Sequence, residues 1–330
     1  MCKIDFTFGV LAYNQADIIC ETLNSIKYQI LNFGKHLNCR LVVTDDNSKD
    51  NTVEVLEKWI SQNGYLFKQI IKKYNDKNQG VPSNYDFIMN QIHEECFKVI
   101  AADDLISSND IFKKANSISP NTIYNGLPVY IKNNKIELNN NALRHQFWVM
   151  QKNMTHKRYI REFKLGKLLH TPSMLYSKKM YVDGKCRELN SQFKFFEDNP
   201  TWYCMFKNIP SLKLQFDEEC LVLYRISERS ISNRKKKDSV SEAFKNELYR
   251  LYKIYINEGD IFDKIYFSIK MNSFFEAIHF TTFLEKIKKF IILIYCILHR
   301  GKFNLFKEVA NIELAKQIQF YENIKSESFI

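Results

Sequence analysis

Short apolar segments alternate with helix-forming segments over the first hundred residues, and this alternation constrains the fold more than any other feature. The apolar runs of strand length are 6–12, 41–44, 67–71 and 97–101, and the segments with helical spacing are 19–26, 52–60 and 85–92. Strands that alternate with helices in this way are typical of βαβ units. The sequence therefore predicts an α/β fold with a Rossmann-like, mainly parallel central sheet flanked by helices.

Polar clusters follow three of the predicted strands directly. They are Tyr13-Asn14, Asp45-Asp46 and Asp103-Asp104. The carboxyl ends of parallel strands lie at one edge of a sheet, where such sheets bind their ligands. Any one cluster alone would also suit a turn or a helix cap. Three clusters after three strands predict a single site.

The adjacent carboxylates Asp103 and Asp104 are the candidates for a divalent metal site. The nine glycines form neither GxGxxG nor GxxxxGK[ST], so the dinucleotide fingerprint and the P-loop are excluded. A phosphate group must then be held in another way, and a cation bound by hard carboxylate oxygens is one. The alternative is a turn or a helix cap, but residues 107–109 are better placed to cap the helix expected at Ile111 and Phe112.

The charge balance predicts an anionic partner. The chain has 48 Lys+Arg against 37 Asp+Glu, a formal net charge of +11. Nucleic acid, phosphorylated metabolites and a membrane surface all fit this excess. The eight cysteines form no CxxC pair, and the amino-terminal residues have a strand pattern rather than that of a secretory signal, so we expect a reducing compartment. The longest apolar run, 290–298, is far shorter than the roughly 20 residues that span a bilayer.

Six ordered segments resemble the sequence blocks of family 2 glycosyltransferases of the GT-A fold. They lie within about residues 4–232 and read FTFGVLAYNQADIICETLNSIKYQI, LVVTDDNSKDNT, NQGVPSNYDFIM, VIAADDLI, LLHTPSMLYSKKMYVDGKCRELNSQFKFFEDNPTW and LVLYRISERSIS. The resemblance implies an inverting, metal-dependent glycosyltransferase. Such an enzyme would move a sugar from a UDP- or dTDP-sugar to a hydroxyl of a glycan acceptor in bacterial capsule, O-antigen or lipopolysaccharide synthesis.

The resemblance also implies roles for single residues around the donor. The nucleotide-binding residues would be Tyr13, Asn14, Asp45, Asp46, Asn78, Gly80, Asn84, Asp103 and Arg225. Tyr13 would stack on the base and Asp46, or its neighbour Asp45, would accept the imide N–H. Asp103 would contact the ribose and, together with Asp104, a Mn²⁺ or Mg²⁺ ion. Alanines stand at 101 and 102, where many relatives have a further aspartate.

The segment FFEDNPTW carries the candidates for catalysis. Direct displacement needs a carboxylate that takes the proton of the acceptor hydroxyl. Asp198 is the first choice for this base and Glu197 the second, and which of the two acts stays open. The same residues would also suit a cap of the helix that Pro200 opens. His170 is the only histidine near an acceptor-side block, and a structural role is expected for it.

One later block departs from the family pattern. Ser227 stands where relatives often have a histidine credited with metal or diphosphate contact. Arg225 or the basic run 234–237 could pair with the diphosphate instead.

The chain is expected to divide into a GT-A domain at 1–232 and a basic helical region at 233–330. Within the domain, 1–115 would bind the nucleotide-sugar and 116–232 the acceptor. The helical C-terminal extension has two interpretations, a cap packed on the domain or an interfacial helix on anionic lipid. We expect a cytoplasmic enzyme, with peripheral contact on the inner face of the membrane, a glycan or lipid-linked glycan acceptor and no nucleic-acid partner.

Two other functions are alternatives to a glycosyltransferase. A nucleotidyltransferase that makes sugar nucleotides usually has a Gly-rich basic loop after the first strand, where this chain reads LAYNQADII. A non-enzymatic protein that binds nucleic acid or membrane would explain the charge but not the ordered aspartates.

Overall fold

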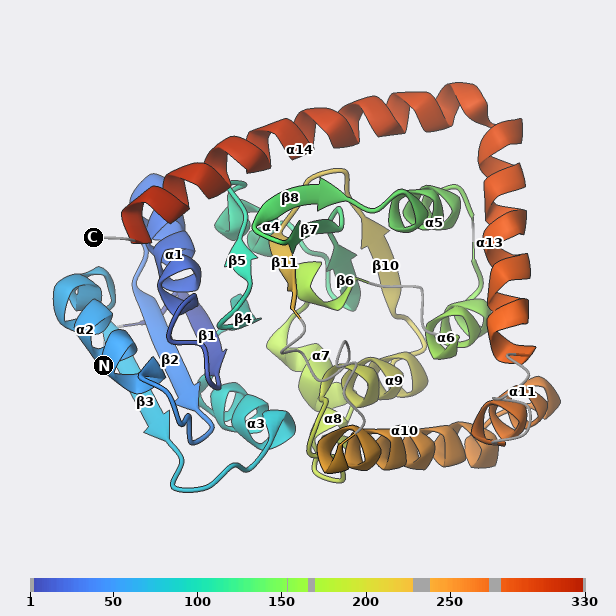
Figure 1. The fold of residues 1–330 in the computed structure, drawn as a ribbon, viewed down its shortest axis with the longest axis horizontal. Coiled ribbons are helices and arrows are strands. Elements are labelled where there is room, and N and C mark those ends of the chain that lie inside the picture. Colours follow the sequence, from blue (N-terminus) through green and yellow to red (C-terminus); the bar gives the residue numbers. More distant parts are fainter. Residues whose placement is uncertain (1–2, 153, 166–169, 228–237, 273–279, 329–330) are drawn as a thin grey trace.

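The structure is a computed structural model that describes residues 3–152, 154–165, 170–227, 238–272 and 280–328. Its first layer is a parallel sheet with the strand order β3 (Gln69–Tyr74), β2 (Cys39–Asp45), β1 (Phe6–Ala12) and β4 (Phe97–Ala101). The helices between these strands are α1 (Ile19–Phe33), α2 (Thr52–Asn63) and α3 (Val81–Gln91), as Figure 1 shows. The predicted parallel sheet flanked by helices is confirmed.

Alternation along the strands sets which helix covers which face of this sheet. In β1, Phe8 and Val10 are fully buried in the core that α1 and α2 complete. Gly9 points to the opposite face, where a Cβ atom would lie 2.5 Å from Ile88 of α3. Successive side chains of a strand point to opposite faces, so both faces of the sheet are covered.

Two boundaries and one cap differ from the expectation. Strand β3 begins at Gln69 rather than 67, because Phe67 closes the short 3-10 helix η1 (Gly64–Leu66). Helix α3 begins at Val81, since Pro82 fits a first helical turn. The expected cap at 107–109 is wrong: Asp110 caps α4 (Ile111–Asn116) by accepting a 2.9 Å hydrogen bond from the Lys113 N–H.

The second half of the chain adds two small sheets. One has the order β5 (Leu105–Ile106), β11 (Val222–Ile226), β7 (Val129–Lys132) and β8 (Lys135–Leu138), and the other β10 (Lys213–Phe216), β6 (Thr122–Asn125) and β9 (Met174–Leu175). The helical elements there are α5 (Asn140–Met150), α6 (His156–Lys164), η2 (Thr171–Ser173), α7 (Lys178–Asp183), α8 (Cys186–Asn190) and α9 (Asp198–Asn208).

The C-terminal helices surround this second half. They are α10 (Ser239–Glu258), α11 (Ile261–Met271), α13 (Phe280–Leu298) and α14 (Arg300–Ser328). In Figure 1, α13 lies at the side remote from the parallel sheet, and α14 returns across the molecule to contact α1. Within the described ranges, no helix combines the length and apolarity needed to cross a membrane.

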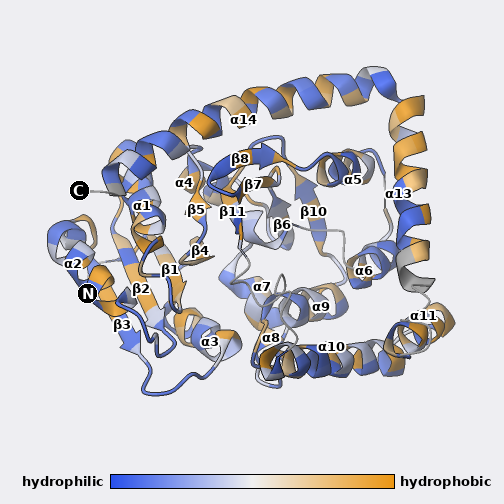
Figure 2. Ribbon diagram, viewed as in Figure 1, coloured by the Kyte–Doolittle hydropathy of each residue, from blue (hydrophilic) through white to orange (hydrophobic). Residues whose placement is uncertain are grey.

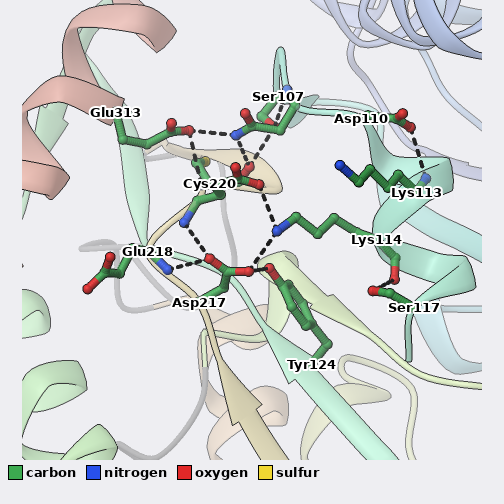
Figure 3. Close-up of polar contacts among 12 residues, drawn as sticks. Ser107, Asp110, Lys113, Lys114, Ser117, Tyr124, Asp217, Glu218, Cys220 and Glu313 are labelled. Atoms are coloured by element: carbon green, nitrogen blue, oxygen red, sulfur yellow. Dashed lines mark hydrogen bonds and ion pairs between the residues drawn. The ribbon is translucent and has the colours of Figure 1, made fainter. Parts of the chain in front are cut away.

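Buried polar contacts attach α14 to the connection that follows the Asp103-Asp104 pair. Glu313 of α14 accepts hydrogen bonds from the Asn109 amide at 2.6 Å and from the Cys220 backbone N–H at 3.1 Å. Figure 3 shows Glu313 directed at Cys220, and beside them the 2.8 Å ion pair of Lys114 with Asp217. The last helix is therefore bonded to a segment two hundred residues earlier in the chain.

Candidate functional site

A cleft of about 1520 Å³ opens at the carboxyl ends of the parallel strands. The residues that follow β1, β2 and β4 line one side of it. The segments 170–176 and 194–202 contribute most of the other side. This is the edge of the sheet at which the sequence predicts a ligand site.

The cleft brings most of the predicted site residues together. Those that line it are Tyr13, Asn14, Asp46, Asn78, Gly80, Asn84, Asp103, Asp104, Glu197 and Asp198. Asp45 and Arg225 are not among its described lining residues.

Tyr13 and Asn14 form a turn at the end of β1. The Tyr13 side chain is 47% exposed, so its ring is free to receive a planar ligand. Asn14 has φ 54°, a left-handed conformation that asparagine tolerates. Its N–H donates to Ser48 Oγ at 2.8 Å and its Oδ1 accepts from the Lys49 N–H at 2.7 Å. The turn after β1 is thus tied to the turn after β2.

The two aspartates after β2 have different tasks. Asp45 Oδ2 accepts a 2.9 Å hydrogen bond from the Ser48 N–H, which is the turn role that sequence left open. Asp46 accepts from the N–H groups of Gln79 at 2.7 Å and Gly80 at 2.9 Å. Asp46, rather than Asp45, therefore lies in the cleft and shapes the loop that carries Asn78 and Gly80.

Gly80 permits a close approach of two backbone segments across the cleft. Its φ is +87°, a region that favours glycine, and a Cβ atom there would lie 2.2 Å from the carbonyl oxygen of Lys194. The next residue, Val81, donates its N–H to the same carbonyl at 3.0 Å. The loop after β3 is thereby fixed to the segment that leads to Glu197 and Asp198.

The carboxylates of Asp103 and Asp104 lie at the end of β4. Asp104 is 4% exposed, and its Oδ1 accepts a 2.8 Å hydrogen bond from the Arg225 N–H. Burial raises the pKa of both carboxyls, and the charge of Asp103 raises the pKa of Asp104 further. A bound cation would offset both effects, because it favours the charged carboxylates.

The pair provides suitable but incomplete ligands for a divalent cation. In the described part of the chain, no three His, Cys, Asp or Glu side chains gather closely enough to hold a metal by themselves. Mg²⁺ and related ions are commonly held by one or two carboxylates together with substrate phosphates and water. The residues present therefore fit a cation that arrives with a phosphorylated ligand.

Arg225 binds the backbone and side chain of the carboxylate pair and does not line the cleft. Its guanidinium donates to the Asp103 carbonyl at 2.8 Å and forms an ion pair with Glu21 of α1. It also contacts the Tyr321 hydroxyl of α14 at 3.4 Å. This placement gives no support to the expected pairing with a diphosphate. The alternative run 234–237 lies outside the described residues.

Glu197 and Asp198 enter the cleft at the start of α9. Asp198 Oδ1 accepts a 2.7 Å hydrogen bond from the Asn199 N–H, so the carboxylate meets the amino end of the helix. Burial raises the pKa of Asp198. Burial first, and the charge of Asp198 second, raise the pKa of Glu197 to about 8. Two adjacent carboxyls with raised pKa values suit proton transfer near neutral pH.

Two residues of the cleft, Lys98 and His170, are not among the site residues predicted from the sequence. The Lys98 ammonium is buried in the cleft floor and donates to the carbonyls of Pro172 at 2.6 Å and Met174 at 2.9 Å. Burial lowers its pKa to about 7, although Asp104 acts in the opposite direction. A lysine within the apolar strand FKVIA was the signal available in sequence. His170 lines the same floor, with its ring 5.7 Å from that of Tyr224.

A family model matches more than half of the chain. Residues 7–183 match the family described as Glycosyl transferase family 2. Two curated relatives are poly-beta-1,6-N-acetyl-D-glucosamine synthases of Staphylococcus aureus strains MSSA476 and MW2. Each is 30% identical over 87 residues, or 25% of this chain and 20% of the relative. The match therefore spans about a fifth of the length of these relatives.

Solved structures of S. aureus TarS are similar in fold, two of them over nearly the whole chain. TarS 1–349 in complex with UDP-GlcNAc has a TM-score of 0.55 at 16% identity, covering 98% of this chain and 91% of TarS 1–349. TarS 1–349 alone has a TM-score of 0.53 at 17% identity, with coverages of 98% and 92%. A longer TarS structure has 0.51 at 19% identity, with coverages of 78% and 40%. This likeness confirms the predicted GT-A fold.

Proposed function

The chain belongs to glycosyl transferase family 2, and from this premise we propose that it is an inverting, metal-dependent enzyme of surface polysaccharide synthesis. It transfers a sugar from a UDP-sugar to a hydroxyl of a glycan acceptor. The observation that carries the proposal is one cleft that contains both the Asp103-Asp104 pair and the Glu197-Asp198 pair. A leaving group and an attacking hydroxyl need separate assistance, and the two pairs provide it.

The donor side is formed by the three strand ends. Tyr13 stacks on the base and Asp46 holds the loop against which the nucleotide lies. Asp103 and Asp104 would hold a Mn²⁺ or Mg²⁺ ion, which would supply positive charge against the departing diphosphate. The complex of TarS with UDP-GlcNAc favours UDP over dTDP as the nucleotide.

The acceptor side is formed by the start of α9. Asp198 takes the proton of the acceptor hydroxyl as its oxygen attacks the anomeric carbon, and the bond from that carbon to the diphosphate oxygen breaks in the same step. One base is enough for this single displacement, so the configuration at the anomeric carbon inverts. Glu197, whose pKa is raised to about 8, is the second candidate for the base.

Membership of the family decides against the other two functions. A nucleotidyltransferase and a non-enzymatic binding protein both leave the match over residues 7–183 unexplained.

A hydrolysis screen tests the proposal directly. The protein is incubated with UDP- and dTDP-sugars and Mn²⁺, and release of the nucleoside diphosphate is measured. We expect slow release from at least one UDP-sugar, abolished by EDTA. No release from any donor would contradict the proposal.

We further propose that α13 rests on an anionic membrane surface. Its outward side chains include Phe290, Ile294 and Ile297, which are 61%, 40% and 61% exposed, and Figure 2 shows long apolar stretches on this helix. Lys286 and Lys289 are also exposed on α13, and cations beside an apolar stripe suit anionic headgroups. This contact would place a lipid-linked acceptor near the enzyme.

A further inference from the structure

A second cavity of about 270 Å³ adjoins the cleft. It lies between helices α5 and α13 and strands β6 and β7. His170 lines both the cavity and the cleft, so the two spaces share a wall. A ligand that occupies the cleft could therefore have a neighbouring unit in the cavity.

Two polar side chains that line the cavity, Gln146 and His170, have buried atoms without a partner among the described residues. Gln146 of α5 is 5% exposed, and its Nε2 donates to the Asp217 carbonyl at 2.8 Å. Its Oε1 has no hydrogen-bond partner among the described residues, and the same holds for both ring nitrogens of His170. Buried polar groups in proteins are nearly always hydrogen-bonded, to protein, water or ligand. A ligand with hydrogen-bonding groups would supply the partners that the described residues do not provide.

The chemistry of the lining indicates the class of ligand. The Gln146 carbonyl oxygen accepts from a hydroxyl group. Burial, aided by the charge of Lys98, lowers the pKa of His170 to about 3, so the neutral ring offers one donor and one acceptor. The side chains of Tyr130 and Phe216 add apolar ring surface to the same cavity. Hydroxyl groups combined with an apolar ring face are features of a sugar.

We propose that this cavity is an acceptor subsite that holds one sugar ring, with Gln146 and His170 bound to its hydroxyls. The adjoining unit of the same glycan then presents its reacting hydroxyl to Asp198 in the cleft. The inference rests on the proposed function and specifies where the acceptor binds. The small volume limits the subsite to a single ring, since pockets for larger ligands begin near 300 Å³.

Saturation-transfer NMR on the intact protein tests the subsite. The probes are glucose, galactose, N-acetylglucosamine and N-acetylgalactosamine, each at millimolar concentration. We expect at least one to bind, and Gln146→Met to weaken that binding about fivefold or more, because one hydrogen bond is lost. Ala142→Leu, which fills the cavity from α5 without changing the Gln146 bond, should have the same effect. Gln319→Met, at an exposed position of α14, is the matched control.

Two results would overturn the inference. The first is that no probe binds, which would mean that water alone fills the cavity. The second is that the probes bind equally well to the wild type, Gln146→Met and Ala142→Leu. Melting curves show whether each variant is folded. If Gln146→Met does not fold, the binding measured with Ala142→Leu tests the subsite by itself. UDP binding with Mn²⁺ is measured on the wild type in parallel. Failure of that binding would contradict the proposed function, whereas UDP binding without a sugar effect would contradict the subsite alone.

Discussion

Asp198 is the residue on which the proposed chemistry depends most. Asp198→Asn keeps the oxygen that accepts the Asn199 N–H but removes the basic carboxylate. We expect release of UDP from the donor to fall by a factor of about 10² to 10⁴, the usual contribution of a general base. UDP affinity, measured by calorimetry, should be unchanged. Retained turnover would move the role of base to Glu197.

Glu197 makes stability depend on pH in an unusual direction. Its pKa rises from the ordinary 4.5 to about 8 in the folded protein, so the folded state binds its proton more tightly than the unfolded state. Stability therefore falls as pH rises from about 4.5 to about 8. Glu197→Gln removes the contribution of Glu197 to this dependence and leaves those of the other buried carboxyls.

Melting temperatures without divalent cations, at two pH values on either side of neutrality, test this direction. Glu197→Gln should gain stability relative to wild type at the higher pH and gain less at the lower. A difference between the two proteins that does not change with pH would mean that the Glu197 carboxyl titrates normally.

At the scale of elements, α14 stabilises the connection that follows the Asp103-Asp104 pair through buried hydrogen bonds of Glu313. Glu313→Ala would leave the buried donors of Asn109 and Cys220 without their acceptor. We expect a loss of about 2–3 kcal/mol in the free energy of unfolding, measured with urea. Glu308→Ala, at an exposed position of the same helix, is the control and should change little. Equal effects of the two substitutions would show that α14 is not braced through Glu313.

The elements that sequence predicted best are those with a strong period. Strand β1 and helix α2 follow directly from apolar spacing, since local pattern decides which face is buried. The predicted start of strand β3 is two residues too early, because Phe67 is buried at the end of a 3-10 turn rather than in a strand. A buried aromatic residue has the same apolar signal in both settings.

The site was predictable where it depends on strand ends and family blocks, and not where it depends on distant pairing. Asp103, Asp104, Glu197 and Asp198 all line the cleft as expected. The placement of Arg225 was not predictable, because its bond to the Asp103 carbonyl joins residues 122 positions apart. Which anion pairs with a buried arginine is decided by packing of separate elements, on which a local motif carries no information.

At the scale of the whole molecule, the exposed apolar side chains of α13 predict that this helix binds a membrane. We expect the protein to sediment with vesicles of equal phosphatidylglycerol and phosphatidylcholine at low salt. The triple variant Phe290→Ser/Ile294→Ser/Ile297→Ser should bind at least tenfold more weakly, since each buried side chain contributes about 1.5–3 kcal/mol. Tyr65→Ser, which removes a 77% exposed ring elsewhere, is the control.

Size-exclusion chromatography distinguishes the two possible partners of α13, a membrane and a second copy of the protein. If the wild type is a dimer that the triple variant dissociates, and vesicles bind neither protein, a second copy covers this helix and the membrane proposal is wrong.

The central claim is that a UDP-sugar and a divalent cation bind together at the end of β4. Calorimetric titration of UDP with and without Mn²⁺, on the wild type and on Asp104→Asn, tests it most directly. The variant keeps an oxygen for the Arg225 N–H, so it should remain folded. We predict Mn²⁺-dependent UDP binding in the wild type and an affinity at least tenfold lower, about 1.4 kcal/mol, in Asp104→Asn. Equal affinities, or no binding of UDP by the wild type, would contradict the account.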